Sequence, residues 1–291
     1  MIYTIFIIII IAGGAVVYYW WSTTQPTDIV ETAKANGSFT TLVQALTAAN
    51  LVDTLKGTGP FTVFAPTDAA FNALPAGVLN ALLSNTTKLT EVLTYHVSSG
   101  KLMAADVTSL ASVTTLQGGT LPINTTAGVK IGPATITQTD ILCSNGLIHV
   151  INKVLVPAKI MDIVQTAQYY GFSTLVTAVQ TAELVSTLNS TGPFTVFAPT
   201  DAAFSALPSG VLSDLLADKT ALTNVLTYHV VSGKLMAADV VTHSTLTTVQ
   251  GEDLTITTTG GVKVNGANVI QTDIECSNGV IHVVDAVLLP P

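Results

Sequence analysis

Charged side chains are scarce in this chain. Lys and Arg together number 10 and Asp and Glu number 18 among 291 residues, which leaves a net charge of −8. So few cations exclude nucleic-acid binding by phosphate neutralisation, and they offer equally little to an anionic membrane surface. Hydrophobic residues make up 48% of the chain and its mean hydropathy is +0.58, so we expect large apolar cores and a segment that lies in lipid.

Cysteine is nearly absent. Cys143 and Cys276 lie 133 positions apart, at equivalent places of an internal repeat. One cysteine per repeat is too few for a disulfide framework, so we interpret both as small buried hydrophobic residues, with a bridge between the repeats as the alternative. The sequence has no C-x-x-C, H-E-x-x-H or H-x-H spacing, and we predict no metal ion and no cofactor.

Catalytic signatures are missing as well. The chain contains no G-x-S-x-G elbow, no phosphate-binding loop and no G-x-G-x-x-G. The features that the repeats share are mostly apolar, whereas a duplicated active site would show matched polar clusters. We therefore predict that the protein is not an enzyme. An extracytoplasmic hydrolase is kept as the least favoured alternative.

The first 21 residues, MIYTIFIIIIIAGGAVVYYWW, carry no charged side chain and are long enough to cross a bilayer as a helix. Aromatic residues lie near both ends, as in an interfacial belt. We predict a transmembrane anchor helix over residues 1–21 and a linker over 22–27, with a cleaved signal segment as the alternative. The rest of the chain is then extracytoplasmic, either membrane-anchored or secreted.

A stretch of twelve residues occurs twice. Pro60 to Phe71 reads PFTVFAPTDAAF and recurs unchanged at Pro193 to Phe204. The remaining sequence aligns around this pair, which predicts two tandem domains over residues 28–157 and 158–291.

Within each repeat, helical patterns precede strand patterns. Apolar residues recur at helical spacing over residues 39–49, 77–83 and 89–96. The repeated stretch predicts a short strand that leads into a helix capped by Thr67. Short β-like runs follow Gly100, and Asn145-Gly146 marks a hairpin. Helices followed by antiparallel strands predict an α+β fold.

Three of these motifs resemble the fasciclin-like (FAS1) domain family, and they occur in the same order in both repeats. They are Thr62 to Phe71 with Thr195 to Phe204, the pairs Tyr95-His96 and Tyr228-His229, and the segments Asn145 to Pro157 and Asn278 to Pro290. The resemblance covers nearly the whole of both repeats. It implies that each repeat is a β-sandwich or wedge of short strands packed with several helices. It also implies an adhesive function at the cell surface or in the matrix.

The resemblance further implies contact residues, because family members use Asp-Ile pairs and the Tyr-His region for receptor contact. The matching positions are Tyr95, His96, Tyr228, His229, Asp140, Ile141, Asp162, Ile163, Asp273 and Ile274. For the histidines, their apolar surroundings favour a buried, hydrogen-bonded structural role instead. One motif position differs, since the second repeat has Asp285 where the first has Asn152. Candidate glycosylation sites in Asn-x-Ser/Thr sequons are Asn36, Asn85, Asn124 and Asn189.

We therefore expect a non-catalytic cell-surface adhesion protein. Its partner would be a protein or polysaccharide at a cell surface or in a matrix, or other copies of the same chain. Two domains on one chain would bind such a repetitive surface bivalently. The alternative is a structural component of a surface layer, envelope or particle.

Overall fold

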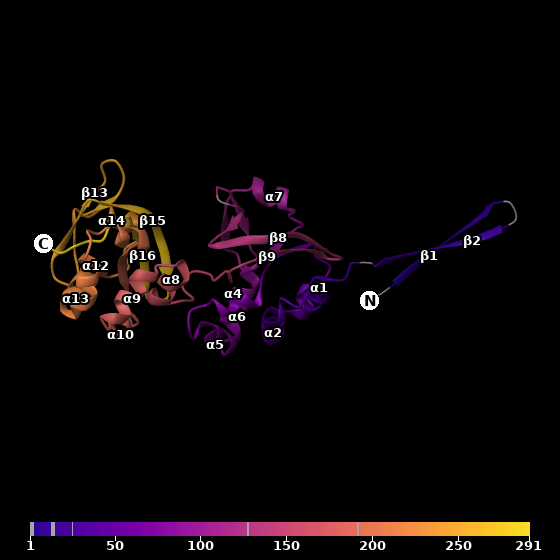
Figure 1. Cartoon of the computed structure of the whole chain (residues 1–291), viewed down its shortest axis with the longest axis horizontal. Helices are drawn as coiled ribbons and strands as arrows, with labels where there is room; N and C mark the ends of the chain where they lie inside the picture. The colour runs from indigo at the N-terminus through magenta and orange to yellow at the C-terminus, as the bar shows by residue number, and fades with distance from the viewer. Residues whose placement is uncertain (1–2, 13–14, 25, 127, 191) are drawn as a thin grey trace. The chain divides into compact units, whose positions relative to one another are not determined.

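The chain divides into two units, Met1–Leu74 with Leu79–Pro157 and Pro75–Val78 with Ala158–Pro291 (Figure 1). The structure is a computed structural model that describes residues 3–12, 15–24, 26–126, 128–190 and 192–291, with only the backbone described before residue 26. From residue 29 onward the same helices and strands follow one another in the same order in both units, as the sequence repeat requires.

The N-terminal segment forms a two-stranded antiparallel hairpin. Strand β1 (Tyr3–Ala12) pairs with β2 (Ala15–Thr24), with Tyr3 opposite Thr24 at one end and Ala12 opposite Ala15 at the other. The segment is rich in isoleucine, valine and aromatic residues, which favour extended backbone. The helix predicted over residues 1–21 is therefore wrong for residues 3–12 and 15–21, and its other residues lie outside the described part of the chain. No helix among the described residues is long and apolar enough to cross a bilayer.

The helices of both units are short. In unit 1 they are α1 (Ile29–Asn36), α2 (Thr40–Ala48), α3 (Val52–Lys56), α4 (Asp68–Asn72), α5 (Val78–Leu83), α6 (Thr86–Tyr95) and α7 (Ala104–Ser109). In unit 2 they are α8 (Ile163–Tyr170), α9 (Ser173–Thr181), α10 (Val185–Leu188), α11 (Asp201–Ser205), α12 (Val211–Ala217), α13 (Lys219–Tyr228) and α14 (Ala237–Val240).

Each unit also contains one mixed seven-stranded sheet. The strands of unit 1 are β3 (Phe61–Pro66), β4 (Val97–Ser99), β5 (Ser112–Thr114), β6 (Thr120–Asn124), β7 (Lys130–Ile131), β8 (Ala134–Cys143) and β9 (Gly146–Ile151), in the order β4-β3-β9-β8-β7-β6-β5. Those of unit 2 are β10 (Phe194–Pro199), β11 (Val230–Ser232), β12 (Thr245–Thr247), β13 (Asp253–Thr257), β14 (Lys263–Val264), β15 (Ala267–Cys276) and β16 (Gly279–Val284), in the order β11-β10-β16-β15-β14-β13-β12.

The two ends of each sheet meet, so the sheet curls around part of the core. In unit 1 the amide of Leu116, just after β5, donates to the carbonyl of Val97 in β4 at 2.7 Å. In unit 2 the amide of Val249 donates to the carbonyl of Val230 at the same distance. This curling produces the wedge that the family resemblance implied, and the α+β class is confirmed.

The sequence patterns suggested antiparallel strands, but each sheet is mixed. Strand β3 runs parallel to β9, and β10 runs parallel to β16. The hairpin predicted at Asn145-Gly146 is present, with Cys143 opposite Gly146 in the β8–β9 pair. All six residues of β9 and of β16 are buried. A central strand covered on both faces reads as a continuous apolar run, which hides its pairing direction.

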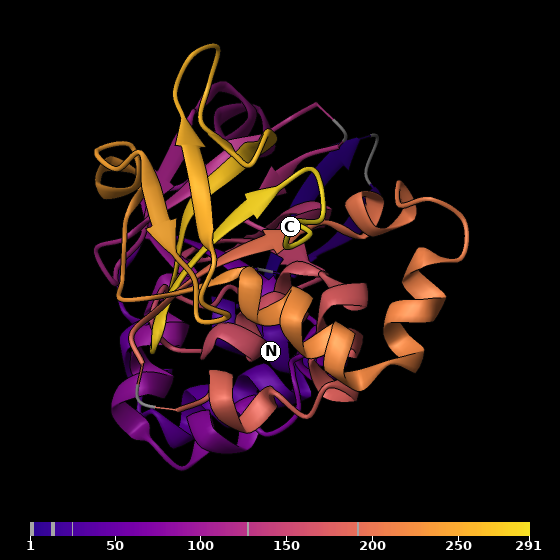
Figure 2. The same cartoon turned by 90° about the vertical axis from the view of Figure 1, so that its left-hand side faces the viewer.

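Alternate residues of the central strands enter two separate cores. In unit 2, Val196 and Ala198 of β10 pack with the helices, whereas Phe197 packs inside the curled part of the sheet. Figure 2 shows most helices of this unit gathered on one side of its strands. Cys276 belongs to the helical core, and both cysteines are free and buried, as predicted.

A half-buried amide ties the helices to the sheet. The Oδ1 atom of Asn145 accepts from the Ile29 amide at 3.0 Å, and its Nδ2 donates to the carbonyls of Leu55 at 2.7 Å and Gly57 at 2.9 Å. Asn278 makes the equivalent bonds in unit 2. A fully used amide at the hairpin fixes where α1 begins and where α3 ends.

The repeated stretch caps two helices at once. Thr67 accepts from the Ala70 amide at 3.3 Å and caps α4, as predicted. The carboxylate of Asp68 reaches a second helix and accepts from the amides of Thr41 at 2.7 Å and Thr40 at 3.2 Å. Burial raises the pKa of Asp68, but these amide bonds lower it more, so the pKa lies below its ordinary value.

Candidate interaction site

The histidines of the Tyr-His pairs are structural. The Nδ1 atom of His96 donates to the Val92 carbonyl at 2.7 Å, and its Nε2 accepts from the Leu155 amide at 2.8 Å. A carbonyl can only accept and an amide N–H can only donate, so the imidazole is neutral with its proton on Nδ1. Burial lowers the pKa of His96 to about 4, against a smaller rise from the bond to Val92.

His229 repeats this arrangement, with bonds of 2.7 Å to the Val225 carbonyl and 2.9 Å from the Leu288 amide. Burial again lowers the pKa to about 4. Both imidazoles are 1% exposed. They join the end of a helix to the last segment of their unit, so neither presents a surface to a partner in this conformation.

The tyrosines brace the curled sheet. The Tyr95 hydroxyl donates to the Thr120 carbonyl at 3.2 Å, and the Tyr228 hydroxyl donates to the Asp253 carbonyl at 3.1 Å. Tyr228 is buried and also accepts from Asn265, whereas Tyr95 is half-buried. Burial raises the pKa of Tyr95. Of the four Tyr-His residues, Tyr95 is therefore the one with appreciable surface.

Two of the three Asp-Ile pairs occupy equivalent places. Asp140 and Asp273 have left-handed backbone, with φ of 59° and 61°. The Asp140 carboxylate accepts from the Ala104 amide at 3.0 Å, and Asp273 accepts from the Ala237 amide at 2.8 Å. These amides begin α7 and α14, so each carboxylate fixes a helix to the sheet. Ile141 is half-buried.

The third pair is different. Asp162 is the N-cap of α8 and exchanges hydrogen bonds with Gln165 in a capping box. Ile163 is buried in the helical core, as is Ile274 of the second pair. The ten proposed contact residues are thus not brought together, and their role in contact stays a prediction.

Strands β8 and β15 each carry an exposed surface that sequence reasoning missed. The pairing of β8 with β9 shifts register twice between Ile136 and Ile141, and residues 137–139 are exposed in succession instead of alternating. Residues 270–273 are exposed in the same way on β15. We call residues 137–142 of β8 and 270–275 of β15 the strand surfaces.

Each strand surface includes a large exposed hydrophobic side chain. Leu142 is 52% exposed and Ile270 is 57% exposed, which makes them the most exposed large hydrophobic residues in the described part of the chain. Strand β7 pairs with β8 at Lys130 and Ile131, and the Ile136 amide donates to the Val129 carbonyl at 2.9 Å, so this pairing stops before residue 137. Exposed apolar side chains beside an incompletely paired strand are typical of a binding surface.

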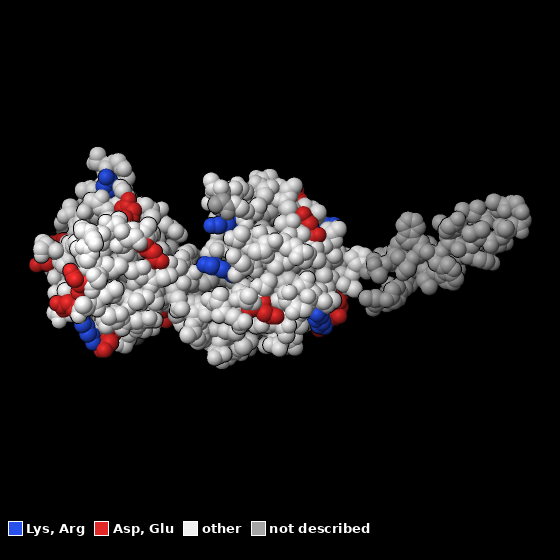
Figure 3. All heavy atoms as spheres, in the orientation of Figure 1, with Lys and Arg blue, Asp and Glu red and all other residues white. Residues whose placement is uncertain are grey.

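The two strand surfaces differ in charge. Unit 2 has Glu275 where unit 1 has Leu142, and this carboxylate forms ion pairs with Lys234 and, at 3.3 Å, with Lys159. The hydrogen bond from Lys234 lowers the pKa of Glu275 most. Charged side chains are sparse over the face drawn in Figure 3. The same scaffold thus carries an apolar side chain at this position in unit 1 and a charged side chain in unit 2.

The motif carboxylate that differs between the repeats has a backbone role. Asp285 accepts from the Asn268 amide at 2.7 Å, and Asn152 accepts from the Thr135 amide at 2.8 Å. An amide oxygen serves as well as a carboxylate here, so the position requires an acceptor and not a charge.

The four sequon asparagines, Asn36, Asn85, Asn124 and Asn189, are exposed. Asn85 also caps α6 by accepting from the Lys88 amide at 3.1 Å. Glycosylation at these positions stays a prediction. No group of three or more His, Cys, Asp or Glu residues is placed to hold a metal ion among the described residues.

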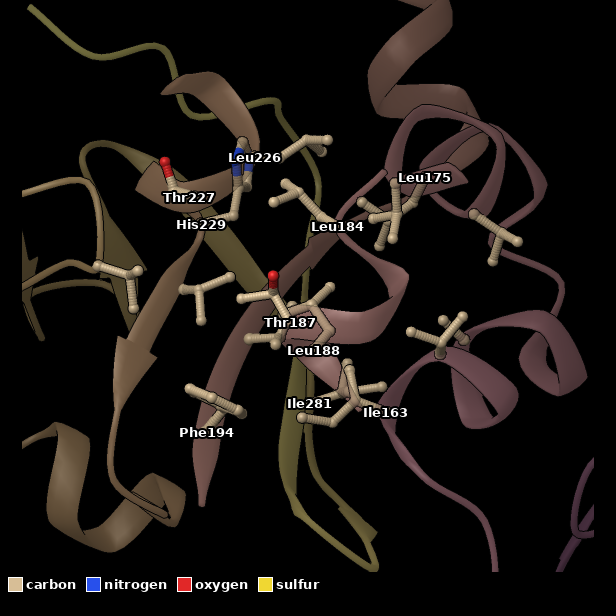
Figure 4. Close-up of a pocket in the computed structure, with 17 residues that line it drawn as sticks. Ile163, Leu175, Leu184, Thr187, Leu188, Phe194, Leu226, Thr227, His229 and Ile281 are labelled. Carbon is tan, nitrogen blue, oxygen red and sulfur yellow. The ribbon is translucent and has the colours of Figure 1, made fainter. Parts of the chain in front are cut away.

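Unit 2 also contains an apolar cavity of about 40 Å³. It lies between helices α8, α9, α10 and α13 and strands β10, β11 and β16 (Figure 4). Its lining is aliphatic or aromatic except for Thr187, Thr227 and His229. No sequence motif predicted it, because every lining position reads as ordinary core.

Two copies of one curled-sheet domain, each with a strand surface at equivalent positions, define a tandem-domain protein. The Fasciclin domain model matches residues 37–157 and 170–290. The chain therefore belongs to the Fasciclin domain family.

The relatives include both shorter and longer proteins. An uncharacterized protein of Synechocystis sp. is 48% identical over 128 residues, which cover 44% of this chain and 96% of that protein. The transforming growth factor-beta-induced protein ig-h3 of Sus scrofa is 30% identical over 271 residues, 90% of this chain but 39% of that protein. Among solved structures, a domain pair from the insect cell adhesion molecule Fasciclin I covers 88% of this chain and 98% of its own, with 21% identity and a TM-score of 0.46.

Proposed function

We propose that this protein acts outside the cytoplasm as a non-catalytic adhesion protein that binds a partner through its two Fasciclin domains. The partner is a protein or polysaccharide of a cell surface or matrix, or another copy of the chain. The observation that carries the proposal is the strand surface, which recurs in both units with a large exposed hydrophobic side chain on each.

The chemistry of the matched polar groups supports binding over catalysis. The two nitrogens of each Tyr-His imidazole are used by a carbonyl and an amide, so neither is free to act as a general base. Asp140 and Asp273 hold helix amides. These groups stabilise the scaffold and leave the exposed strand surfaces to meet the partner.

Two strand surfaces on one chain favour bivalent attachment. Once one unit is bound, the other unit is held near the partner surface. For two binding modules joined by a short linker, the effective concentration of the second module is about a millimolar. Weak individual contacts then add to firm attachment, provided that the partner presents repeated sites.

The repeat itself supplies the variants for a test. Each variant introduces the residue that the other unit has at the equivalent position. Leu142→Glu introduces the residue type of Glu275, and Ile270→Thr introduces that of Thr137. The matched control is Val241→Thr, which introduces the residue of the equivalent position Thr108. It removes an exposed hydrophobic side chain that is not part of either strand surface.

Beads coated with the full chain are assayed for attachment to one another, to collagen and to cellulose. We expect attachment in at least one of the three assays, with a strong loss in Leu142→Glu/Ile270→Thr and none in Val241→Thr. Coated beads that attach no better than bare beads, or a double variant that attaches like the wild type, would contradict the proposal.

A second candidate is a structural component that assembles with copies of itself. The observation in its favour is the N-terminal hairpin, because a sheet of only β1 and β2 has two outer edges that can pair with other chains. Light scattering of the full chain and of residues 25–291 tests it. Assembly predicts an oligomer that depends on residues 1–24, and a monomeric full chain at micromolar concentration rules it out.

A further inference from the structure

The cavity of unit 2 offers a ligand almost no hydrogen-bonding capacity. His229 uses both ring nitrogens within the protein, and the Thr227 hydroxyl donates to the carbonyls of Thr223 at 2.7 Å and Asn224 at 3.2 Å. Thr187 is exposed, as is Val249, and these two mark the side on which the cavity meets solvent. The interior therefore suits a hydrocarbon, whose polar end would stay beside Thr187 in water (Figure 4).

Unit 1 has two more methylene groups at the positions that correspond to this lining. Its residues are identical at 15 of the 17 lining positions, and the exceptions are Leu46 and Leu116, which correspond to Val179 and Val249 of unit 2. Val179 and Leu46 are both buried. Replacing leucine by valine at a buried position removes one methylene and leaves a void when the surroundings do not collapse.

A further lining residue, Val164, is more exposed in unit 2 than its counterpart is in unit 1. Val164 of unit 2 is partly exposed, whereas its counterpart Val30 in unit 1 is fully buried. Helix α1 thus buries its valine fully, whereas α8 leaves the corresponding valine partly exposed to solvent.

We propose that unit 2 binds the end of an unbranched alkyl chain, such as that of a fatty alcohol, fatty acid or lipid, and that unit 1 does not. The volume of about 40 Å³ accommodates roughly three groups of the size of water or methylene. A peptide is a poorer occupant, because its backbone amides would find no free partners on this lining.

The test is a methyl NMR titration of the full chain with 1-hexanol, 1-heptanol, 1-octanol and 1-nonanol. We expect saturable shifts at Ile163, Val179 and Ile281, and none at the counterparts Ile29 and Ile148 of unit 1, which serve as a control in the same molecule. Affinity should rise about fourfold for each methylene that enters the cavity and level off once it is full.

Variants that exchange residues between the units make the test specific. Val179→Leu/Val249→Leu should weaken binding by about tenfold, because its two extra methylenes occupy the space of the ligand. Leu46→Val/Leu116→Val should create shifts in unit 1. Thermal unfolding confirms that each variant folds, and the comparison of the two units in the wild type needs no variant at all.

Phosphatidylcholine vesicles distinguish the source of the alkyl chain. Cosedimentation that is lost in Val179→Leu/Val249→Leu identifies a membrane lipid, whereas alkanol binding without such a loss identifies a soluble amphiphile. The proposal is overturned by absent saturation, by equal shifts in both units, or by unchanged alkanol affinity in Val179→Leu/Val249→Leu.

Discussion

Acidification should destabilise both units through their buried histidines. His96 and His229 are neutral in the folded protein, where burial lowers their pKa from 6.5 to about 4. In the unfolded chain they bind a proton near pH 6.5. The unfolded state therefore binds more protons between pH 6.5 and 4, and the free energy of unfolding falls as the pH falls through this window.

The shift between the two pKa values sets the magnitude. One pKa unit corresponds to about 1.4 kcal/mol, so each unit should lose about 2 kcal/mol between pH 8 and pH 5 and about 3 kcal/mol once the pH is below 4. Both imidazoles are fully buried, so solvent screening does not reduce the effect. A loss of this size is a large part of the stability of a small domain.

The assay is urea unfolding at several pH values between 8 and 4, followed through resolved NMR methyl signals of each unit. His96→Gln keeps a donor and an acceptor but does not titrate. It should cost unit 1 about 1–3 kcal/mol at pH 8 and flatten the pH dependence of that unit alone. His229→Gln does the same for unit 2. Equal pH dependence in wild type and variants would refute the reasoning.

Three further predictions concern the scaffold. Asn145→Ala removes three part-buried hydrogen bonds and should lower the free energy of unfolding of unit 1 by about 2–4 kcal/mol in urea titrations, whereas a drop below the error of the fit would contradict the role of the amide. Asp68→Asn should cost about 1 kcal/mol at pH 7, and the difference from wild type should vanish as the pH falls through the lowered carboxylate pKa, because the wild-type contribution exists only while Asp68 is ionised. Burial raises the pKa of Cys276 to about 11 and also raises that of Cys143, so both thiols should react with Ellman's reagent far more slowly in the folded than in the unfolded protein; equal rates would contradict their burial.

Local patterns predicted much of the fold. The Asn-Gly hairpin, the cap at Thr67 and the helices at periodic apolar residues are all present, because each depends on residues close in sequence. The N-terminal helix was wrong, since hydropathy measures how apolar a segment is and not which backbone conformation its β-branched residues prefer. The parallel pairing of β3 with β9 was missed because the pattern of apolar and polar residues within a strand does not show which distant strand it pairs with.

The sequence by itself determined the repeat, the family, the α+β class and the absence of recognisable catalytic motifs, because each of these lies in the order and type of residues. Only the tertiary structure decided what the shared residues do. His96 and Asp140 match motifs of contact residues, yet folding places them against a backbone amide or carbonyl. The strand surfaces arise from register shifts between strands, and the cavity is enclosed by helices and strands that lie far apart in the sequence. Register and packing volume depend on distant parts of the chain meeting in space, which no local pattern records.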